Sequence, residues 1–302
     1  MTRGVRALTL VCAVALVAGA RAEPQAPLPD PDAFYRAVRE NLVRAERAND
    51  RYVYRERRTD IHTNPFGKLG TGGVSVYEVY PSPVRQLDYR RLIERNGEPV
   101  PASERARQDR EYRARAANVL RERAARVPDE ERLVEEESAR ARARRQRTID
   151  DVVATLAFEM RERTLYQGVS AIVIAFKPKP DARPDTRQGR LAQKFAGTVW
   201  IDERAAEVMR VEATSIDDIS YGLGLVARLG EGTTATVTRA PVEGGVWMPS
   251  ELTLKGQGRA VLFRRLVLDF SIGWFDYRPL PDDLLAPFLD PRVHGQPGRG
   301  PQ

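Results

Sequence analysis

Few side chains in this sequence have the type and spacing that catalysis or metal binding requires. The 302 residues include two histidines, His62 and His294, and one cysteine, Cys12. A zinc site needs three or four His, Cys or carboxylate ligands, usually at short and regular spacing. His62 stands at the end of a predicted strand and His294 in a Pro- and Gly-rich tail, without a ligand-spaced partner. The sequence therefore predicts no metal centre and no cofactor.

The remaining candidates for chemistry are two pairs of adjacent aspartates, Asp217-Asp218 and Asp282-Asp283. Neighbouring residues point to opposite faces in a strand, and in turns they are usually solvated, so neither pair predicts a general acid and base. Gly222-Leu223-Gly224 is shorter than the glycine-rich loops that bind phosphate, and no serine lies in a nucleophile-elbow pattern. We therefore predict that the protein is not an enzyme.

The first 22 residues have the pattern of a secretory signal. Arg3 and Arg6 precede an uncharged apolar run over residues 7–20, and Ala20-Arg21-Ala22 supplies small residues for signal peptidase. The run is shorter than the roughly 20 residues of a membrane span. We expect cleavage before Glu23 and a periplasmic mature protein; an uncleaved N-terminal anchor is the alternative.

Cys12 lies inside this signal. It follows Leu10-Val11 rather than the small residue that precedes an acylated cysteine, so we expect no lipid attachment. The mature chain then has no disulfide, no cysteine nucleophile and no thiolate metal site. Its stability must come from its core.

Composition favours a globular protein with one large β domain or two small domains. Hydrophobic residues make up 42% of the chain and charged residues 30%, with a net charge of +7. The arginines are mixed with carboxylates and are not interleaved with aromatic residues, which argues against a nucleic-acid partner. A salt-sensitive, peripheral contact with an anionic membrane remains open.

The N-terminal part reads as one helix followed by strands. Asp30 and Pro31 have the types expected at a helix start, and Phe34, Val38 and Leu42 form one apolar face of a helix that ends near residue 49. Strand-forming segments follow at residues 51–63, 74–80 and 84–94. The last is closed by Asn96-Gly97, a hairpin dipeptide, so we predict an antiparallel meander.

Residues 104–148 are dominated by arginine, alanine and glutamate, and Pro128 divides them into two helices. Their large apolar residues are few: Tyr112, Val119, Leu120, Val127, Leu133 and Val134. We predict a solvated helical excursion with i,i+4 ion pairs that folding does not require. A lid or a partner-docking arm is the functional alternative. Residues 149–158 are more apolar, and we expect them to form a helical face that docks on the core.

Strand patterns return after residue 162 and continue to about residue 280. Glycines 244 and 245 mark a hairpin within this part. The clearest strand covers residues 262–277, where alternate positions are apolar and predict a one-sided core. These positions are Leu262, Leu266, Leu268, Phe270, Ile272 and Trp274. Residues 281–302 are Pro- and Gly-rich, and we expect a loose tail.

Three segments carry a family resemblance. FAGTVWIDERAAEVMRVEA (residues 195–213) resembles a hairpin of the LolA/LolB/RseB-like periplasmic lipoprotein carriers. GGVWMPSELTLKGQGR (residues 244–259) resembles their next strand pair, and FSIGWFDYRPL (residues 270–280) resembles their closing strand. The likeness covers residues 166–280.

The resemblance implies an α+β fold: an antiparallel half-barrel of about eleven strands wrapped around helices, formed here by residues 23–280 as a single domain with the charged excursion inserted. It implies an apolar cavity that binds lipid or lipoprotein acyl chains without catalysis, in outer-membrane lipoprotein sorting. The candidate cavity-lining residues are Trp200, Trp247, Leu266, Leu268, Phe270 and Trp274. The alternative is a cell-envelope sensor or interaction protein that docks a partner through the Arg-rich helices.

Overall fold

The structure is a computed structural model. It describes residues 27–62, 70–82, 87–126, 130–221, 227–260 and 264–280. The predicted signal sequence with Cys12, the glycines at 222–224, the aspartates at 282–283 and the tail with His294 lie outside the described residues.

The described residues form four α-helices and one thirteen-stranded antiparallel sheet. The first half of the chain contains α1 (Pro31–Ala48), a 3-10 turn η1 (Asn49–Arg51), β1 (Tyr52–His62), β2 (Gly70–Tyr80), β3 (Tyr89–Arg95), β4 (Glu98–Pro99), α2 (Ala102–Arg126) and α3 (Glu130–Thr155). The second half contains β5 (Leu156–Tyr166), β6 (Val169–Pro178), α4 (Arg187–Ala192), β7 (Phe195–Asp202), β8 (Val208–Ser215), β9 (Ile219–Tyr221), β10 (Ala227–Leu229), β11 (Thr234–Pro241), β12 (Trp247–Ala260) and β13 (Arg264–Pro279).

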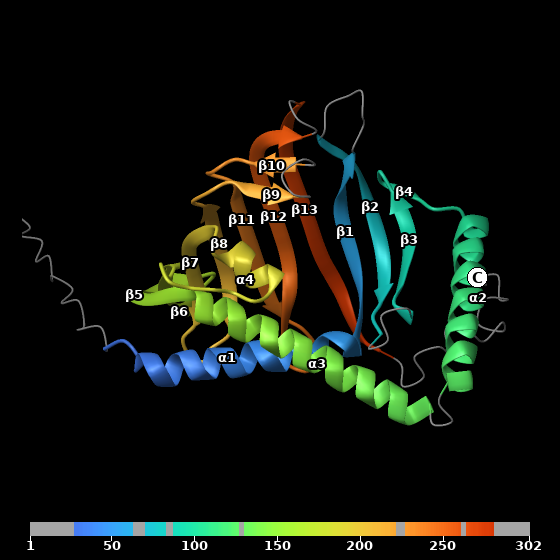
Figure 1. Ribbon diagram of the computed structural model, residues 1–302, viewed down its shortest axis with the longest axis horizontal. Helices are drawn as coiled ribbons and strands as arrows, with labels where there is room; N and C mark the ends of the chain where they lie inside the picture. Colours follow the sequence, from blue (N-terminus) through green and yellow to red (C-terminus); the bar gives the residue numbers. More distant parts are fainter. Residues whose placement is uncertain are drawn as a thin grey trace, which may run out of the picture.

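The sheet is open, with β4 at one end and β5 at the other. Its order is β4-β3-β2-β1-β13-β12-β11-β8-β7-β6-β5; off this path, the short strand β10 pairs with β12, and β9 pairs with β10. Within the described residues the two end strands do not pair, so the sheet forms an open half-barrel, and α1 and α3 run across one end of its strands (Figure 1). The predicted α+β half-barrel is confirmed, with thirteen strands in the described residues rather than about eleven.

Helix α1 begins and packs as its sequence predicts. The Asp30 carboxylate accepts a hydrogen bond from the backbone N–H of Ala33 at 2.9 Å, and Pro31 occupies the first turn. Phe34 and Val38 are buried against β6 and β7 in the main core cluster. Asn41, a buried polar residue, donates to two backbone carbonyls in the turn before β8 and fixes the helix to the sheet.

The predicted hairpin turns are confirmed by their backbone angles. Asn96 and Gly97 have φ values of 54° and 84°, and they join β3 to β4. Gly244 and Gly245 have φ values of 86° and 73° between β11 and β12. Two consecutive positive φ angles are the feature that asparagine and glycine tolerate in such turns.

Helix α2 packs on the sheet more closely than the sequence predicts. Tyr112 is 3% exposed, Ala116 is fully buried, and both belong to a second core cluster with Leu87 and Tyr89. The Tyr112 hydroxyl donates to the Leu87 carbonyl at 2.8 Å. The excursion therefore includes a docked segment as well as exposed arginines.

Helix α3 ends earlier than predicted. It stops at Thr155, and Leu156–Tyr166 is already strand β5, paired with β6 over its whole length. The residues predicted to continue the helix, Leu156 and Phe158, instead alternate along β5. A short apolar run fits either a helix or a strand, and here pairing with a neighbouring strand decides the outcome.

Candidate ligand-binding site

The strand register gives the sheet two chemically distinct faces. Residues directly paired in adjacent antiparallel strands point to the same face. We call the face that packs against α1 and α3 the inner face. One row of paired residues crosses it from β5 to β1: Met160, Ile174, Val199, Val211, Val237, Leu252, Ile272 and Arg58. The row is apolar over seven strands and ends on an arginine.

A second inner row shows the same pattern. It consists of Phe158, Phe176, Gly197, Ala213, Ala235, Leu254 and Phe270. The row on the outer face is largely polar: Ala175, Thr198, Glu212, Thr236, Thr253 and Ser271. This alternation over β6 to β13 makes the inner face the apolar side of the half-barrel.

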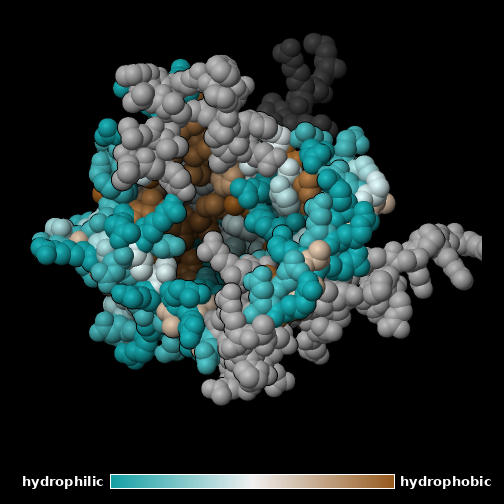
Figure 2. Space-filling view, turned by 45° about the vertical axis from the view of Figure 1, so that its right-hand side comes forward, coloured by the Kyte–Doolittle hydropathy of each residue, from teal (hydrophilic) through white to brown (hydrophobic). Residues whose placement is uncertain are grey.

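An apolar cavity of about 510 Å³ lies between the inner face and the two helices. Its lining residues are Tyr35, Arg36, Val38, Arg39, Leu42, Val152, Val153, Leu156, Phe158, Ile174, Phe176, Val199, Ile201, Val208 and Val211. Figure 2 shows hydrophobic surface in a hollow, with hydrophilic surface on its left and right. The volume falls within the range of roughly 300–1,000 Å³ that is typical of small-molecule sites.

The apolar inner face continues beyond the helices to β13. Leu266, Leu268 and Phe270 are buried, and the outward residues between them are exposed, as the predicted alternation requires. Leu252 and Ile272 are only half-buried. The inner face therefore offers apolar area outside the cavity beneath α1 and α3.

The structure separates the predicted site residues into three groups. Leu266, Leu268, Phe270 and Trp274 share the inner face of β13, where Trp274 pairs with Glu56 of β1. Trp200 pairs with Val173 and Arg210 on the outer face, opposite the cavity residues Val199 and Ile201. Trp247 is half-buried at the start of β12, where its carbonyl accepts a hydrogen bond from Arg239 at 2.6 Å.

Glu207, a buried carboxylate just before β8, pairs with a buried arginine of the sheet and with an exposed arginine of α1. Arg239 Nη1 lies 3.5 Å from Glu207 Oε2, and Arg44 Nη2 lies 3.2 Å from Glu207 Oε1. Burial raises the pKa of Glu207 and outweighs the opposing charges of Arg239 and Arg44. Burial also lowers the pKa of Arg239. Burial is the main cause of both shifts, as expected for charges removed from water.

A charged cluster that the sequence analysis did not single out lies at the β1 end of the inner face. Glu56 forms ion pairs with Arg58 and with Arg90 of β3. Glu56 and Arg58 occupy inner positions because they pair with Trp274 and Ile272. In β1 the charges occur on both faces, so the sequence has no apolar alternation to show which of them point inward.

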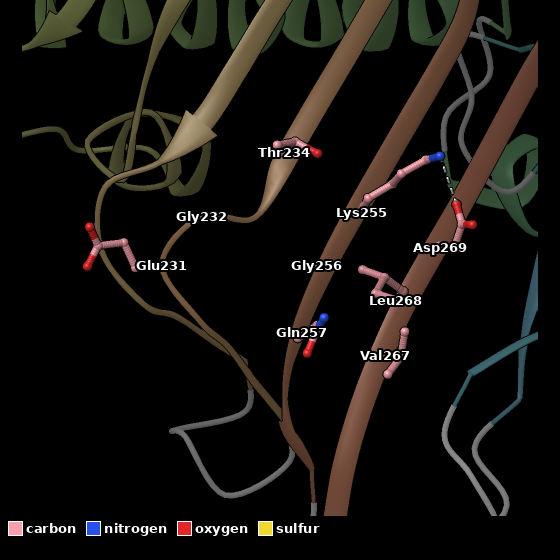
Figure 3. Close-up of a pocket in the computed structure, with 9 residues that line it drawn as sticks. All are labelled: Glu231, Gly232, Thr234, Lys255, Gly256, Gln257, Val267, Leu268 and Asp269. Carbon is pink, nitrogen blue, oxygen red and sulfur yellow. Dashed lines mark ion pairs between the residues drawn. The ribbon is translucent and has the colours of Figure 1, made fainter.

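A polar depression of about 600 Å³ lies where β11 separates from β12, and Figure 3 shows its lining. Lys255 and Asp269 form an ion pair of 3.9 Å across β12 and β13, and both side chains are largely exposed. Leu268 borders the depression from the inner side of β13. Its lining carries two carboxylates, Glu231 and Asp269, for one ammonium, Lys255, and only Val267 and Leu268 are large and apolar, so it is a weaker candidate for a hydrophobic ligand than the apolar cavity.

No group of three or more His, Cys, Asp or Glu residues that could hold a metal ion occurs among the described residues. Within the same part of the chain, no helix has the length and apolar character needed to cross a membrane.

No family model matches this sequence, and no curated protein matches it. Among solved structures, the chain is similar to a DUF1329 family protein from Desulfovibrio piger, with 10% identity and a TM-score of 0.30 over 88% of this chain and 99% of that chain. It is also similar to a putative outer membrane lipoprotein-sorting protein domain from Vibrio parahaemolyticus, with 10% identity and a TM-score of 0.27 over 85% of this chain and 99% of that chain.

Proposed function

We propose that the protein is a non-enzymatic periplasmic binding protein that holds a hydrophobic moiety, a lipid or the acyl chains of a lipoprotein, on its inner face. The observation that carries this proposal is the continuity of the apolar surface. Paired apolar residues run from β5 to β13, and the 510 Å³ cavity under α1 and α3 opens onto them. Residues 266, 268, 270 and 274 extend this surface along β13.

Transfer of apolar groups from water supplies the affinity. Each buried methylene contributes about 0.8 kcal/mol, so an acyl chain can be held without covalent chemistry. A cavity with apolar walls also favours the chain over a polar solute, because a polar group there would lose its hydrogen bonds to water.

The helices that cover the cavity are joined to each other by two ion pairs, one exposed and one partly buried. Arg39 Nη2 lies 2.5 Å from Asp150 Oδ1, and Arg145 Nε lies 3.9 Å from Glu46 Oε2. Exposed pairs of this kind contribute about 0–1 kcal/mol each. These ion pairs therefore add little to the apolar packing that holds α1 and α3 on the core cluster.

Native mass spectrometry of the protein purified from the periplasm tests the proposal. We expect lipid to co-purify with the parent chain. Val211→Trp places a bulky ring in the cavity and should remove the bound lipid, at an overpacking cost of about 1–3 kcal/mol. Glu212→Trp is the matched control, because this neighbour in β8 is exposed on the outer face, and it should keep the lipid.

Two results would contradict the proposal. The parent chain could carry no lipid and bind none that is added, or Val211→Trp could bind as well as Glu212→Trp while both remain folded. The first result would show that the protein binds no lipid, and the second would show that the lipid does not bind in the cavity.

The exposed arginines of α3 favour a second candidate, a cell-envelope protein that docks a partner. Arg142 and Arg144 are exposed at the middle of the helix. A photo-crosslinker at position 142 should then give one defined adduct in cells, and Arg144→Glu should abolish it. An unchanged adduct would count against docking through this helix.

A further inference from the structure

The charged cluster on the inner face contains two guanidinium groups for one carboxylate. Arg90 Nη2 donates to Glu56 Oε1, and Arg58 Nη1 lies 3.7 Å from the same oxygen. The Glu56 side chain is 5% exposed, whereas those of Arg58 and Arg90 are 33% and 42% exposed. These three residues together carry one excess positive charge, and both arginine side chains are partly exposed.

Aromatic rings of the inner face hold both guanidiniums in place. The Arg58 guanidinium carbon lies 5.7 Å from the centre of the Phe270 ring, and that of Arg90 lies 5.1 Å from the centre of the Tyr77 ring. A guanidinium over a ring is attracted by the ring face and keeps its N–H donors at its edge. The arrangement fixes two forks of donors at the end of an apolar surface.

The distances fit a long acyl chain. Arg58 and Val211 belong to the same inner row and are separated by four strand spacings, through β13, β12 and β11. Adjacent strands lie about 4.8 Å apart, so the row from Arg58 to the cavity spans about 19 Å. A fatty acyl chain laid along this row would bring its polar end to the arginines.

We propose that the ligand is an anionic amphiphile whose carboxylate or phosphate binds Arg58 and Arg90 while its chain lies on the apolar inner face. This inference rests on the proposed function and adds the charge of the ligand's polar end. Arginine forks match carboxylate and phosphate oxygens in pairs, and such charge-assisted hydrogen bonds are about twice as strong as neutral ones. Glu56 occupies one edge of each fork and competes with the ligand.

Three ligands with a sixteen-carbon chain and different polar ends test the charge requirement on the unaltered protein: palmitate, methyl palmitate and hexadecyltrimethylammonium, each below its micelle concentration or solubility limit. We expect palmitate to bind at least tenfold more tightly than either of the others in calorimetric titrations at low salt. Equal affinities would overturn the inference and leave the proposed function intact. Binding of none of the three would overturn both.

Substitution of the arginines locates the contact. Arg58→Gln and Arg90→Gln should each weaken palmitate binding roughly tenfold, because each removes a charge-assisted contact. Neither should change the affinity for methyl palmitate. The control is Arg57→Gln: Arg57 neighbours Arg58 in β1, pairs with Gly273 on the outer face, and lies 5.9 Å from the centre of the Phe275 ring. Arg57 is therefore of the same residue type as Arg58, lies in the same strand and also contacts an aromatic ring, but it points to the other face.

Glu56→Gln gives a change of the opposite sign. It removes the competing carboxylate and should strengthen palmitate binding several-fold, with melting temperature as the check on folding. A palmitate affinity that is the same in the Arg57, Arg58 and Arg90 variants, or weaker in Glu56→Gln while that variant remains folded, would overturn the inference. If one arginine variant does not fold, the other variant and the three-ligand comparison still decide.

Discussion

Val199 and Trp200 are neighbours in β7 and face opposite sides of the sheet, and this difference decides which of them can touch a ligand. Val199 lines the cavity, whereas Trp200 packs on the outer face near Tyr166, with ring centres 6.3 Å apart. From the sequence of β7 alone, Trp200 is the better candidate for a binding residue, because its ring has the larger apolar area. Only the pairing with β6 and β8 shows that its ring points away from the cavity.

Leu268 should contribute more to stability than either neighbour in the chain. It is 7% exposed on the inner face, whereas Val267 is 45% exposed on the outer face. Leu268→Ala should lower the free energy of unfolding by about 2–5 kcal/mol through lost burial and a residual cavity. Urea titration measures the change.

Two outward positions serve as controls for Leu268. Val267→Ala removes a side chain of similar type from the exposed face, and Asp269→Asn removes only an exposed ion pair with Lys255. Both should change the free energy of unfolding by less than about 1 kcal/mol. Equal effects at residues 267 and 268 would show that the assigned faces are wrong.

At the scale of elements, α2 is the part that the sequence describes least well. Its apolar residues are too few to predict docking, but the helix also packs through polar groups. Asp109 is buried, accepts a hydrogen bond from the Tyr89 hydroxyl at 2.7 Å and forms an ion pair of 3.3 Å with Arg91. The Gln108 amide pairs with both the N–H and the carbonyl of Leu92. It does so on the edge of β3 away from β2, where β4 pairs only with Glu94 and Arg95.

These polar contacts explain why α2 packs on the sheet although the sequence predicts a solvated helix. A count of apolar residues registers Tyr112 but not Asp109 or Gln108, which look like ordinary surface residues of an Arg-rich helix. Their partners in β3 are about 16 to 20 residues away in the chain and become visible only when the strand is placed.

Tyr112→Ala tests whether folding needs α2. Removal of this buried ring and of its bond to Leu87 should lower the free energy of unfolding by about 3 kcal/mol. Tyr112→Phe should cost about 1 kcal/mol, the value of one hydrogen bond. Arg110→Ala, at an exposed position of the same helix, should have almost no effect. A negligible effect of Tyr112→Ala in chemical denaturation would support the sequence prediction that folding does not require residues 104–148.

The ion pairs under α2 should make stability depend on pH. Burial opposes ionisation of Glu78, but the hydrogen bond and charge of Arg91 outweigh it, so the pKa of Glu78 lies below its ordinary value of 4.5. Since the folded-state pKa is depressed, this carboxylate stabilises the fold above the unfolded-state value and loses that contribution as pH falls through the folded-state value.

Glu78→Gln should therefore destabilise the protein at neutral pH, and the difference from the parent should shrink as the pH falls below 4.5. Denaturant titrations at a series of pH values measure this difference. Arg210 and Glu212 form an exposed pair on the outer face, so Glu212→Gln serves as the control with little effect at neutral pH. A difference for Glu78→Gln that stays constant with pH would contradict the expected shift.

At the scale of the whole molecule, the sequence predicts the class of the fold better than its ligand site. Turn residues such as Asn96-Gly97, the capped helix at Asp30 and the alternation of β13 are local signals, and all three are confirmed. The inner-face rows join residues from strands far apart in the chain, such as Ile272 and Arg58. No local pattern in β1 predicts that pairing, so the charged cluster becomes visible only in three dimensions.

The N-terminus of the mature protein should lie just after the predicted signal sequence. The described chain begins just before α1, where the Pro27 carbonyl accepts a hydrogen bond of 3.1 Å from Arg163. Cleavage before Glu23 would leave four residues ahead of this contact. It would also remove Cys12, the only thiol. We expect a maleimide reagent to label the precursor and not the exported protein, and N-terminal sequencing to begin at Glu23.

Replacement of Ala20 and Ala22 by leucine is the matched control for cleavage. Signal peptidase requires small residues at these positions, so the variant should accumulate as a membrane-associated precursor that maleimide labels. A parent protein that retains Met1 and a reactive Cys12 in the membrane fraction would contradict export by a cleaved signal. It would instead establish the N-terminal anchor, and the inner face would then work beside the membrane rather than free in the periplasm.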